Sequence, residues 1–194
     1  IITANHFGRG AKLVNLKVNV DDAIKICAGR GLEVTKCLCF DRGHNEPHNW
    51  VAGRDVWYAE EMASVEAECP CEWVDSEDHL FTLYTSGSTG KPKGMVHSTA
   101  GYMIGTYATT KYIFDMKDDD IYWCTADCGW ITGHSYITFG PLLNGATVVV
   151  FEGLPTFPTP SRIWEIVDKY NVSLFYTAPT AIRSLIRLGD KHVQ

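Results

Sequence analysis

Long apolar runs, a signal-like start and an excess of positive charge are all missing from this sequence of 194 residues. No apolar run approaches the roughly 18–20 residues that a membrane-spanning helix needs. The start, IITANHFGRG, has neither a charged leader nor a long apolar stretch, so it does not resemble a secretory signal. The formal net charge is −6, whereas a nucleic-acid surface would need a basic patch. We therefore expect a protein of the cytoplasm, with the nucleus and the mitochondrion as alternatives, that binds neither membranes nor nucleic acids.

The sequence also lacks the cysteine spacing of a structural zinc site, which repeats Cys-x2–4-Cys. Its seven cysteines include two Cys-x-Cys pairs and one Cys-x3-Cys pair, and they lie at positions 27, 37, 39, 69, 71, 124 and 128. Cys37 and Cys39 fall in the apolar run VTKCLCF and should point to the same face of a sheet. The segment HNEPH, with His44 and His48, is more typical of a polar loop than of a metal site. We expect reduced thiols and no metal bound by these residues.

Expected strands and helices alternate along the chain, without internal repeats or low-complexity segments. The expected strands cover residues 32–40, 79–85, 120–126, 146–153 and 172–178. The expected helices cover 20–31, 54–64, 98–114, 160–171 and 179–190, and 135–145 is an apolar segment of helical or irregular form. Such alternation with short loops predicts βαβ units, so we expect an α/β fold with a mostly parallel sheet flanked by helices. The nearly all-apolar run HLFTLYT at 79–85 is typical of a buried parallel strand.

Three unusual loops directly follow expected strands. A loop rich in Gly, Ser and Lys follows residues 79–85, DCGWITGHS (127–135) follows the strand at 120–126, and TAPT (177–180) follows the strand at 172–178. Ligands of parallel sheets bind beyond the carboxyl ends of the strands. We therefore expect the three loops to crowd one edge of the sheet and to form a ligand site there.

The first of these loops, within LYTSGSTGKPKG (83–94), has the composition of a phosphate-binding loop. Backbone N–H groups can crowd around a phosphate chain only where side chains are absent, which favours glycine, and Lys91 and Lys93 add positive charge. It is not a Walker A loop, because Thr85 stands at the first glycine position and Pro92 follows Lys91, and no Gly-x-Gly-x2-Gly fingerprint is present. The alternative is a surface loop without function, which Pro92 disfavours because it stiffens the backbone.

The segment YTSGSTGKPKG (84–94) resembles the phosphate-loop signature of the adenylate-forming superfamily, which contains acyl-CoA synthetases, luciferases and peptide-synthetase adenylation domains. The segments 9–24, 123–153 and 176–190 resemble the acetyl-CoA synthetases within it, so the likeness covers essentially the whole chain. The resemblance implies that residues 1–194 are an inner portion of the family's large N-terminal domain. The small C-terminal domain, which swings between the two half-reactions, is absent from this sequence.

The resemblance also implies an activity, that of an AMP-forming acetate–CoA ligase. Such an enzyme uses ATP and Mg²⁺ to convert acetate to acetyl-AMP and pyrophosphate, and then transfers the acetyl group to CoA. The sequence offers no candidate ligand for Mg²⁺ and does not specify an oligomeric state. Two alternatives stay open: a ligase for propionate or another short-chain acid, and a nucleotide-binding fragment without catalytic activity. We expect the 194 residues alone to be inactive.

Site residues follow from the matching positions. The resemblance implies ATP phosphate binding by Thr85, Ser86, Gly87, Ser88, Thr89, Gly90, Lys91 and Lys93, with Thr85 and Lys91 as catalytic residues. It implies an acetate pocket at Trp130, Ile131 and Thr132, and CoA contacts at Arg9, Lys12 and Thr132. Lys12 stands where the family has a second Arg, so it keeps the charge but loses the bidentate fork. His134 is a candidate ligand-facing residue, with a role in packing as the alternative.

Overall fold

The computed structural model describes residues 1–43, 48–85 and 90–193. The chain divides into two compact units, Ile1–Pro70 and Cys71–Gln194, and each is described by itself. No helix within the described ranges is long and apolar enough to cross a membrane. The seven cysteines are all free thiols.

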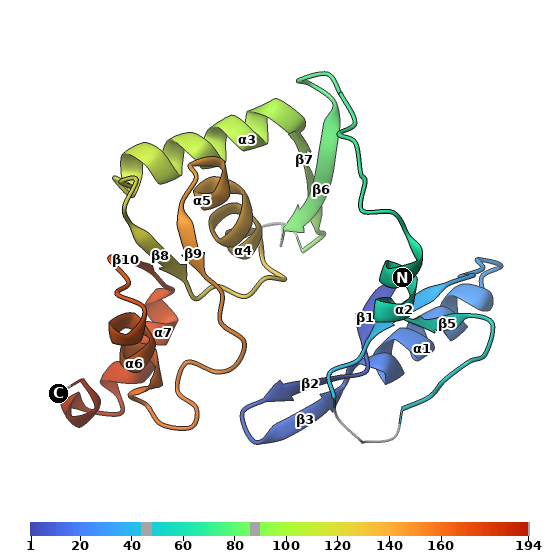
Figure 1. The fold of residues 1–194 in the computed structure, drawn as a ribbon, viewed down its shortest axis with the longest axis horizontal. Helices are drawn as coiled ribbons and strands as arrows, with labels where there is room; N and C mark the ends of the chain where they lie inside the picture. Colours follow the sequence, from blue (N-terminus) through green and yellow to red (C-terminus); the bar gives the residue numbers. More distant parts are fainter. Residues whose placement is uncertain (44–47, 86–89, 194) are drawn as a thin grey trace. The chain divides into compact units, whose positions relative to one another are not determined.

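The first unit contains a small parallel sheet of order β1-β4-β5, a β-hairpin and two helices (Figure 1). Its elements are β1 (Ile2–Ala4), β2 (His6–Arg9), β3 (Lys12–Asn15), α1 (Leu16–Ala28), β4 (Cys37–Phe40), β5 (Asp55–Trp57) and α2 (Tyr58–Ser64). Cys37 and Cys39 are both fully buried, as expected for alternate residues of one strand that share a face. Helix α1 starts earlier than expected, because the side chain of Asn15 accepts a hydrogen bond from the Val18 N–H and caps it there.

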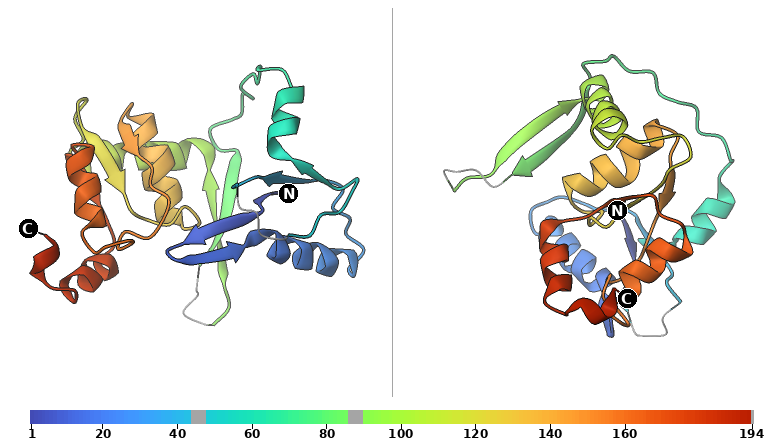
Figure 2. Two further views of the ribbon diagram at one scale, coloured as in Figure 1. Left: turned by 60° about the horizontal axis from the view of Figure 1, so that its bottom comes forward. Right: turned by 90° about the vertical axis from the view of Figure 1, so that its left-hand side faces the viewer.

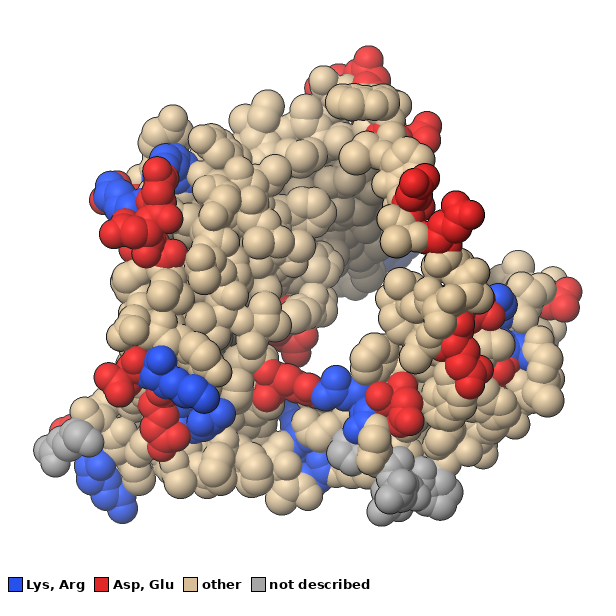
Figure 3. Space-filling view, viewed as in Figure 1, with Lys and Arg blue, Asp and Glu red and all other residues tan. Residues whose placement is uncertain are grey.

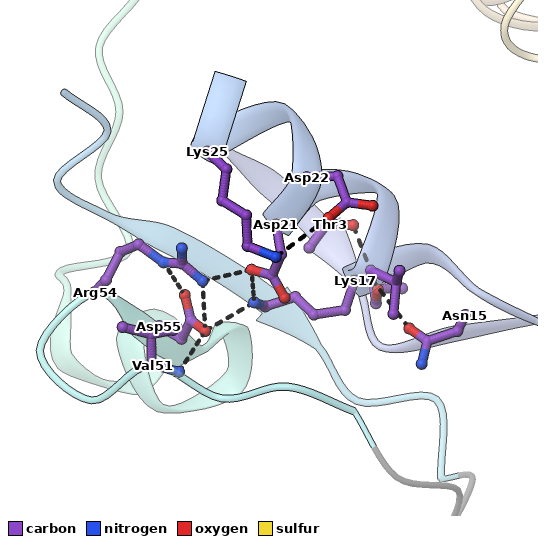
Figure 4. A network of polar contacts seen from close by, with 11 residues as sticks. Thr3, Asn15, Lys17, Asp21, Asp22, Lys25, Val51, Arg54 and Asp55 are labelled. Atoms are coloured by element: carbon purple, nitrogen blue, oxygen red, sulfur yellow. Dashed lines mark hydrogen bonds and ion pairs between the residues drawn. The ribbon is translucent and has the colours of Figure 1, made fainter. Parts of the chain in front are cut away.

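A buried ionic cluster joins α1 to β5 (Figure 4). The Lys17 ammonium, which is fully buried, lies 2.7 Å from Asp21 Oδ1 and 2.8 Å from Asp55 Oδ2. Arg54 closes the cluster with contacts of 2.5 Å to Asp21 and 2.6 Å to Asp55. The charges of the two cations and the two carboxylates cancel, and each ion has a partner of opposite charge, as buried ions in a protein core require. Burial alone would raise the pKa of Asp55, but hydrogen bonds from Arg54 and Lys17 outweigh burial and lower the pKa to about 2.

Two sequence expectations in this unit are wrong. The strand expected over 32–40 covers only β4, because pairing starts where β1 and β5 are available, with Leu38 opposite both Ile2 and Val56. The helix expected over 54–64 is split: residues 55–57 form β5, and α2 begins at Tyr58. The buried carboxylate of Asp55 is held by the ionic cluster, so tertiary contacts override the helical pattern at that position.

The second unit is built on a parallel sheet of order β10-β8-β9 (Figure 1). Its strands are β8 (Ile121–Cys124), β9 (Thr147–Val149) and β10 (Leu174–Tyr176), which confirms the parallel α/β expectation for residues 120–178. Helices α6 (Arg162–Lys169) and α7 (Pro179–Ile186) cover one face, where Trp123 packs with Ile163 and Ile166. The opposite face buries Tyr122, Cys124 and Met116 under Phe114, Tyr136 and Ile137.

The helices that pack on that opposite face are α3, α4 and α5, together with two π-helical turns. Helix α3 (Thr99–Ala108) continues as a π-helical turn over Thr109–Ile113. Helix α4 (Ile131–Gly133) runs through a second π-helical turn, His134–Phe139, into α5 (Gly140–Leu143). Glycine is required at the crossing, because a Cβ on Gly140 would lie 2.3 Å from Thr110 Oγ1 and 2.8 Å from the Ser135 carbonyl oxygen. The expected helices over 98–114, 160–171 and 179–190 and the helical segment at 135–145 are therefore present with shifted ends.

The Gly-rich segment lies on an antiparallel hairpin instead of a buried parallel strand. Strand β6 (His79–Thr85) pairs with β7 (Lys93–Ser98), from Phe81 opposite His97 to Thr85 opposite Lys93. The hairpin extends away from the helices of its unit (Figure 2, right), and its residues are exposed or half-buried. The apolar run at 79–85 correctly marks a strand, but the expectation of burial in the parallel sheet is wrong.

Candidate active site

A cavity of about 710 Å³ opens at the carboxyl ends of β8 and β10. These two strands are neighbours and run parallel, with Cys124 opposite Tyr176, so their following loops emerge side by side. The cavity is lined by Cys124, Thr125, Ala126, Asp127, Trp130, Thr132, Pro155, Tyr176, Thr177, Ala178, Pro179, Thr180, Ala181 and Ser184. Two of the three loops expected at one sheet edge therefore meet there.

The loop after β8 folds back on itself. The carboxylate of Asp127 accepts a hydrogen bond of 2.8 Å from the Gly129 N–H, and the Asp127 carbonyl accepts one of 3.1 Å from the Trp130 N–H. Helix α4 then brings Gly133 onto the start of the loop. A Cβ at Gly133 would lie 2.3 Å from the Asp127 carbonyl oxygen and 2.8 Å from Cys128 Cα. The absence of a side chain at Gly133 allows this close approach. We call the compact turn formed by residues 127–133 the hook.

The hook presents the residues that were expected to hold acetate. Trp130 and Thr132 both line the cavity, and Trp130 is 71% exposed. Ile131, between them, is half-buried and is not part of the lining. His134 is half-buried beside Phe81, with ring centroids 6.5 Å apart in a T-shaped contact, and it does not line the cavity. This ring contact supports the packing interpretation of His134, and the ligand-facing role stays a prediction.

The cavity walls are mainly neutral. Among the described residues that line it, Asp127 is the one with a carboxylate, and its side chain already accepts the Gly129 N–H. Burial raises the pKa of the Cys124 thiol, which keeps it protonated near neutral pH and unsuited to act as a nucleophile. Threonine hydroxyls and backbone groups are the polar groups that this lining offers to a ligand. The arrangement is suited to positioning a small molecule and not to covalent attack on it.

The Gly-rich hairpin lies apart from this sheet edge. Its described end places Thr85 opposite Lys93, with Lys91 and Lys93 both exposed and Gly90 at a φ of 80°, which is left-handed. Gly94 lies under the Tyr84 ring, where a Cβ would be 3.2 Å from a ring carbon. Ser86, Gly87, Ser88 and Thr89 lie outside the described residues. The expectation that all three loops share one edge of one sheet is therefore wrong, because β6 belongs to its own two-stranded sheet.

Tyr102 joins the base of the hairpin to the segment after α4. The Tyr102 ring makes T-shaped contacts with Phe81 of β6 at 4.8 Å and with Phe139 at 5.3 Å. Its hydroxyl is hydrogen-bonded to the Ser135 hydroxyl at 2.7 Å, and both side chains are buried. Burial raises the pKa of Tyr102, so the phenol stays protonated and able to donate. Packing of this kind fixes the start of β6 against the residues that follow the hook.

Arg9 and Lys12, the expected CoA contacts, belong to the first unit. They end β2 and begin β3, and they pair directly across the hairpin, so two exposed cations lie side by side. Like charges directly opposite each other on a hairpin repel, and a bound anion would relieve this repulsion. On the face shown in Figure 3, most Lys and Arg side chains lie beside Asp or Glu, and further Asp and Glu side chains gather at the upper right without Lys or Arg among them.

A metal site does not emerge from the described ranges. No three His, Cys, Asp or Glu side chains there are close enough together to hold an ion.

Comparison with known proteins identifies the family. A family model described as AMP-binding enzyme matches residues 8–194. The chain belongs to this family. The whole chain matches "Acetyl-coenzyme A synthetase, chloroplastic/glyoxysomal" of Arabidopsis thaliana with 58% identity and covers 26% of that protein. It matches "Acetyl-coenzyme A synthetase" of Alcanivorax borkumensis with 57% identity and that of Bartonella bacilliformis with 56%, covering 29% and 30% of them. The chain thus spans less than a third of the length of these curated relatives.

Sequence analysis identified some of the residues that line this cavity and missed others. It singled out Trp130 and Thr132, which the cavity brings together with the TAPT segment. It gave no ligand role to Thr125, Ala181 or Ser184. A signal for Thr125 was present, because the same Thr-Ala dipeptide follows both strands, at 125–126 and at 177–178. Ala181 and Ser184 are three residues apart on α7 and so share a helix face, but only the position of α7 relates that face to the cavity.

Proposed function

We propose that the full-length protein, meaning the whole polypeptide that contains this sequence, is an AMP-forming acetate–CoA ligase. It activates acetate with ATP to acetyl-AMP and pyrophosphate, and then forms acetyl-CoA and AMP. One observation carries the proposal: a segment with a phosphate-loop composition, 84–94, lies in an AMP-binding chain that is 53–58% identical over its whole length to proteins named acetyl-coenzyme A synthetase. Residues 1–194 form an inner portion of the large N-terminal domain in this proposal.

The chemistry of the first step explains why residues of this kind are needed. An acetate oxygen attacks the α-phosphorus of ATP, the bond from that phosphorus to the pyrophosphate oxygen breaks, and pyrophosphate leaves with the electron pair. Charge develops on the leaving pyrophosphate, and donors placed around it lower the barrier. Lys91, Lys93 and the hydroxyl of Thr85 lie at the exposed end of the hairpin, where a phosphate chain can reach them. Ser86 to Thr89 are proposed to complete this loop from their sequence alone.

The second step needs the acyl group and the CoA thiol to meet. The thiol sulfur attacks the acyl carbon of acetyl-AMP, the thiol proton goes to solvent or a base, and the carbon–oxygen bond to AMP breaks. Trp130 and Thr132 line the cavity in which we place the acyl group. Ile131, which the same resemblance includes in that pocket, acts from behind this lining. Arg9 and Lys12 form a cationic pair suited to the phosphates of CoA.

A longer acid is the second candidate substrate. The cavity volume of about 710 Å³ is far larger than a two-carbon acid requires, and it falls in the range of pockets that hold much larger ligands. A series of acids from acetate to butyrate in the same assay ranks them by kcat/KM. Acetate ranks first under the main proposal, and propionate or butyrate ranks first under the alternative.

The direct test is acid-dependent exchange of labelled pyrophosphate into ATP by the full-length protein. We expect exchange with acetate and a loss of at least about a hundredfold in a Lys91→Ala, Lys93→Ala double variant, since cationic clamps on transferring phosphates contribute several kcal/mol. The matched control is Lys111→Ala with Lys117→Ala, which removes two lysines whose partners are surface carboxylates. Absence of exchange in a folded wild-type protein that binds ATP would leave a nucleotide-binding protein without this activity. The 194-residue chain alone is expected to be silent.

A further inference from the structure

The hydroxyl groups of Thr125 and Thr177 form a hydrogen bond of 2.5 Å inside the cavity. Each residue immediately follows a strand: Thr125 comes after Cys124 of β8, and Thr177 comes after Tyr176 of β10. Since Cys124 and Tyr176 are register partners, the two threonines occupy the next rung of the parallel pair. Among the described residues, neither hydroxyl makes a second hydrogen bond that could replace this one.

Among the described residues, this side-chain hydrogen bond is the last one between the two strands before their loops diverge. The backbone ladder ends with the Thr125 N–H donating to the Tyr176 carbonyl at 3.0 Å. Beyond that point one chain enters the hook and the other enters α7. The hydroxyl bond is therefore the contact that sets how far apart the two loops start.

On the β8 side, a series of contacts connects Thr125 to the two hook residues that line the cavity, Trp130 and Thr132. Thr125 is two residues from Asp127, whose carbonyl oxygen lies directly under Gly133. Gly133 is bonded to Thr132, and the Trp130 N–H donates to the same Asp127 carbonyl. Because these contacts are closely packed, a displacement of Thr125 also displaces Trp130 and Thr132.

On the β10 side, the hydrogen bond reaches the first turn of α7. Thr177 precedes Ala178, the N-cap residue, whose carbonyl accepts the Ala181 N–H at 3.0 Å. Ala181 and Ser184, further along α7, also line the cavity. Leu185 packs against the Trp123 cluster and anchors the helix on the sheet. The hydrogen bond between the two hydroxyls therefore connects helix α7, which is anchored on the sheet, with the hook that follows β8.

We propose that Thr125 and Thr177 are positioning residues that set the width of the acyl cavity and thereby the preference among short-chain acids. The inference rests on the proposed function, because it assigns the acyl group to this cavity. Neither threonine takes part in bond making. Their hydroxyl pair holds the two walls at the separation at which Trp130 and Thr132 fit a small acid.

The test uses acid-dependent pyrophosphate exchange by the full-length protein with Thr125→Val, Thr177→Val and the double variant. Valine keeps the shape of threonine and removes the hydroxyl. We expect the KM for acetate to rise about three- to tenfold in each single variant, as for the loss of one hydrogen bond. The preference for acetate over propionate should fall by a similar factor, while the KM for ATP stays within about twofold because the Gly-rich hairpin belongs to another sheet. The double variant should be no worse than either single variant, because both remove the same bond.

Three further variants separate positioning from stability. Thr125→Ser and Thr177→Ser keep the hydroxyl and should restore the wild-type KM for acetate. Thr106→Val removes a buried threonine hydroxyl that bonds within α3, and it should leave both KM values unchanged. Should a valine variant fail to fold, Thr125→Ala and Thr177→Ala provide the same comparison.

The inference and the proposed function fail in different ways. A wild-type protein without acid-dependent exchange refutes the function. Exchange in the wild type, together with valine variants that keep the wild-type KM for acetate and the wild-type acid preference, overturns the inference alone. Additive effects in the double variant would also overturn it, because they would mean that each hydroxyl acts through a different partner.

Discussion

Adding one methyl group to Gly133 should disturb the hook that carries Trp130 and Thr132. The Cβ of Gly133→Ala would lie 2.3 Å from the Asp127 carbonyl oxygen and 2.8 Å from Cys128 Cα. Both atoms are backbone, so no flexible side chain can swing aside. The loop start and α4 must separate instead, which displaces the residues between them.

The size of the effect follows from that overlap. Ordinary contacts of a Cβ begin near 3.4 Å, so the two backbone segments must move apart by roughly 1 Å. A displacement of about 1 Å in a positioning segment can cost on the order of a hundredfold in rate, and overpacking of this kind destabilises a fold by about 1–3 kcal/mol. We therefore expect acetate-dependent pyrophosphate exchange to fall by one to two orders of magnitude in kcat/KM.

The assay compares Gly133→Ala with Gly105→Ala in the full-length protein. Gly105 lies in α3, where an added Cβ meets nothing within 4 Å. Alanine there should leave exchange unchanged and stabilise the helix by up to about 1 kcal/mol. Both proteins are compared at a temperature at which circular dichroism shows them folded, so that lost activity reports on the site.

Equal exchange by Gly133→Ala and the wild type would refute this reasoning. It would mean that the hook relaxes without moving Trp130 and Thr132, or that these residues do not position the acid. A crystal structure of the variant would separate the two explanations: Trp130 and Thr132 at their original positions would support the first, and displaced positions would support the second.

Two further predictions concern stability. The pKa of Asp55 is held at about 2, below its ordinary value of 3.8, so its stabilising contribution is present above about pH 4 and is lost as the pH falls towards 2. The free energy of unfolding in urea should fall by about 2 kcal/mol over this range. The variant Asp55→Asn should lack this pH dependence. Tyr102→Phe leaves the buried Ser135 hydroxyl without its 2.7 Å partner and should cost about 1–3 kcal/mol. Tyr136→Phe, which removes a longer, partly buried bond of 3.2 Å, should cost less in the same unfolding assay, and the reverse order would contradict this account.

The parallel sheet could be predicted from the sequence because its strands are local signals. The Val-containing β9 and the aromatic-rich β8 and β10 are short, apolar and bounded by turn residues, and helices separate them. Antiparallel pairing of β6 could not be predicted in the same way. The partner strand, KGMVHS, starts with Lys and Gly and follows the Gly-rich loop directly, so its sequence is more typical of a loop.

The candidate site shows the same division between local and non-local information. Trp130 and Thr132 were found because they belong to a contiguous motif. The pairing of Thr125 with Thr177 was not found, because the two residues are 52 positions apart and meet only when β8 and β10 become neighbours. The helix pattern at 54–64 failed for a related reason, since the buried contacts of Asp55 with Lys17 and Arg54 decide the conformation there.

The most direct test of the central claim follows the oxygen atoms of acetate. The full-length protein is incubated with ATP, CoA and acetate labelled with ¹⁸O in both carboxylate oxygens, and the AMP formed is analysed by mass spectrometry. Attack of acetate on the α-phosphorus, followed by thiol attack on the acyl carbon, leaves one acetate oxygen on phosphorus, so AMP should gain a single ¹⁸O. Formation of ADP, or of AMP without label while acetyl-CoA accumulates, would contradict an acetyl-AMP intermediate and with it the proposed function.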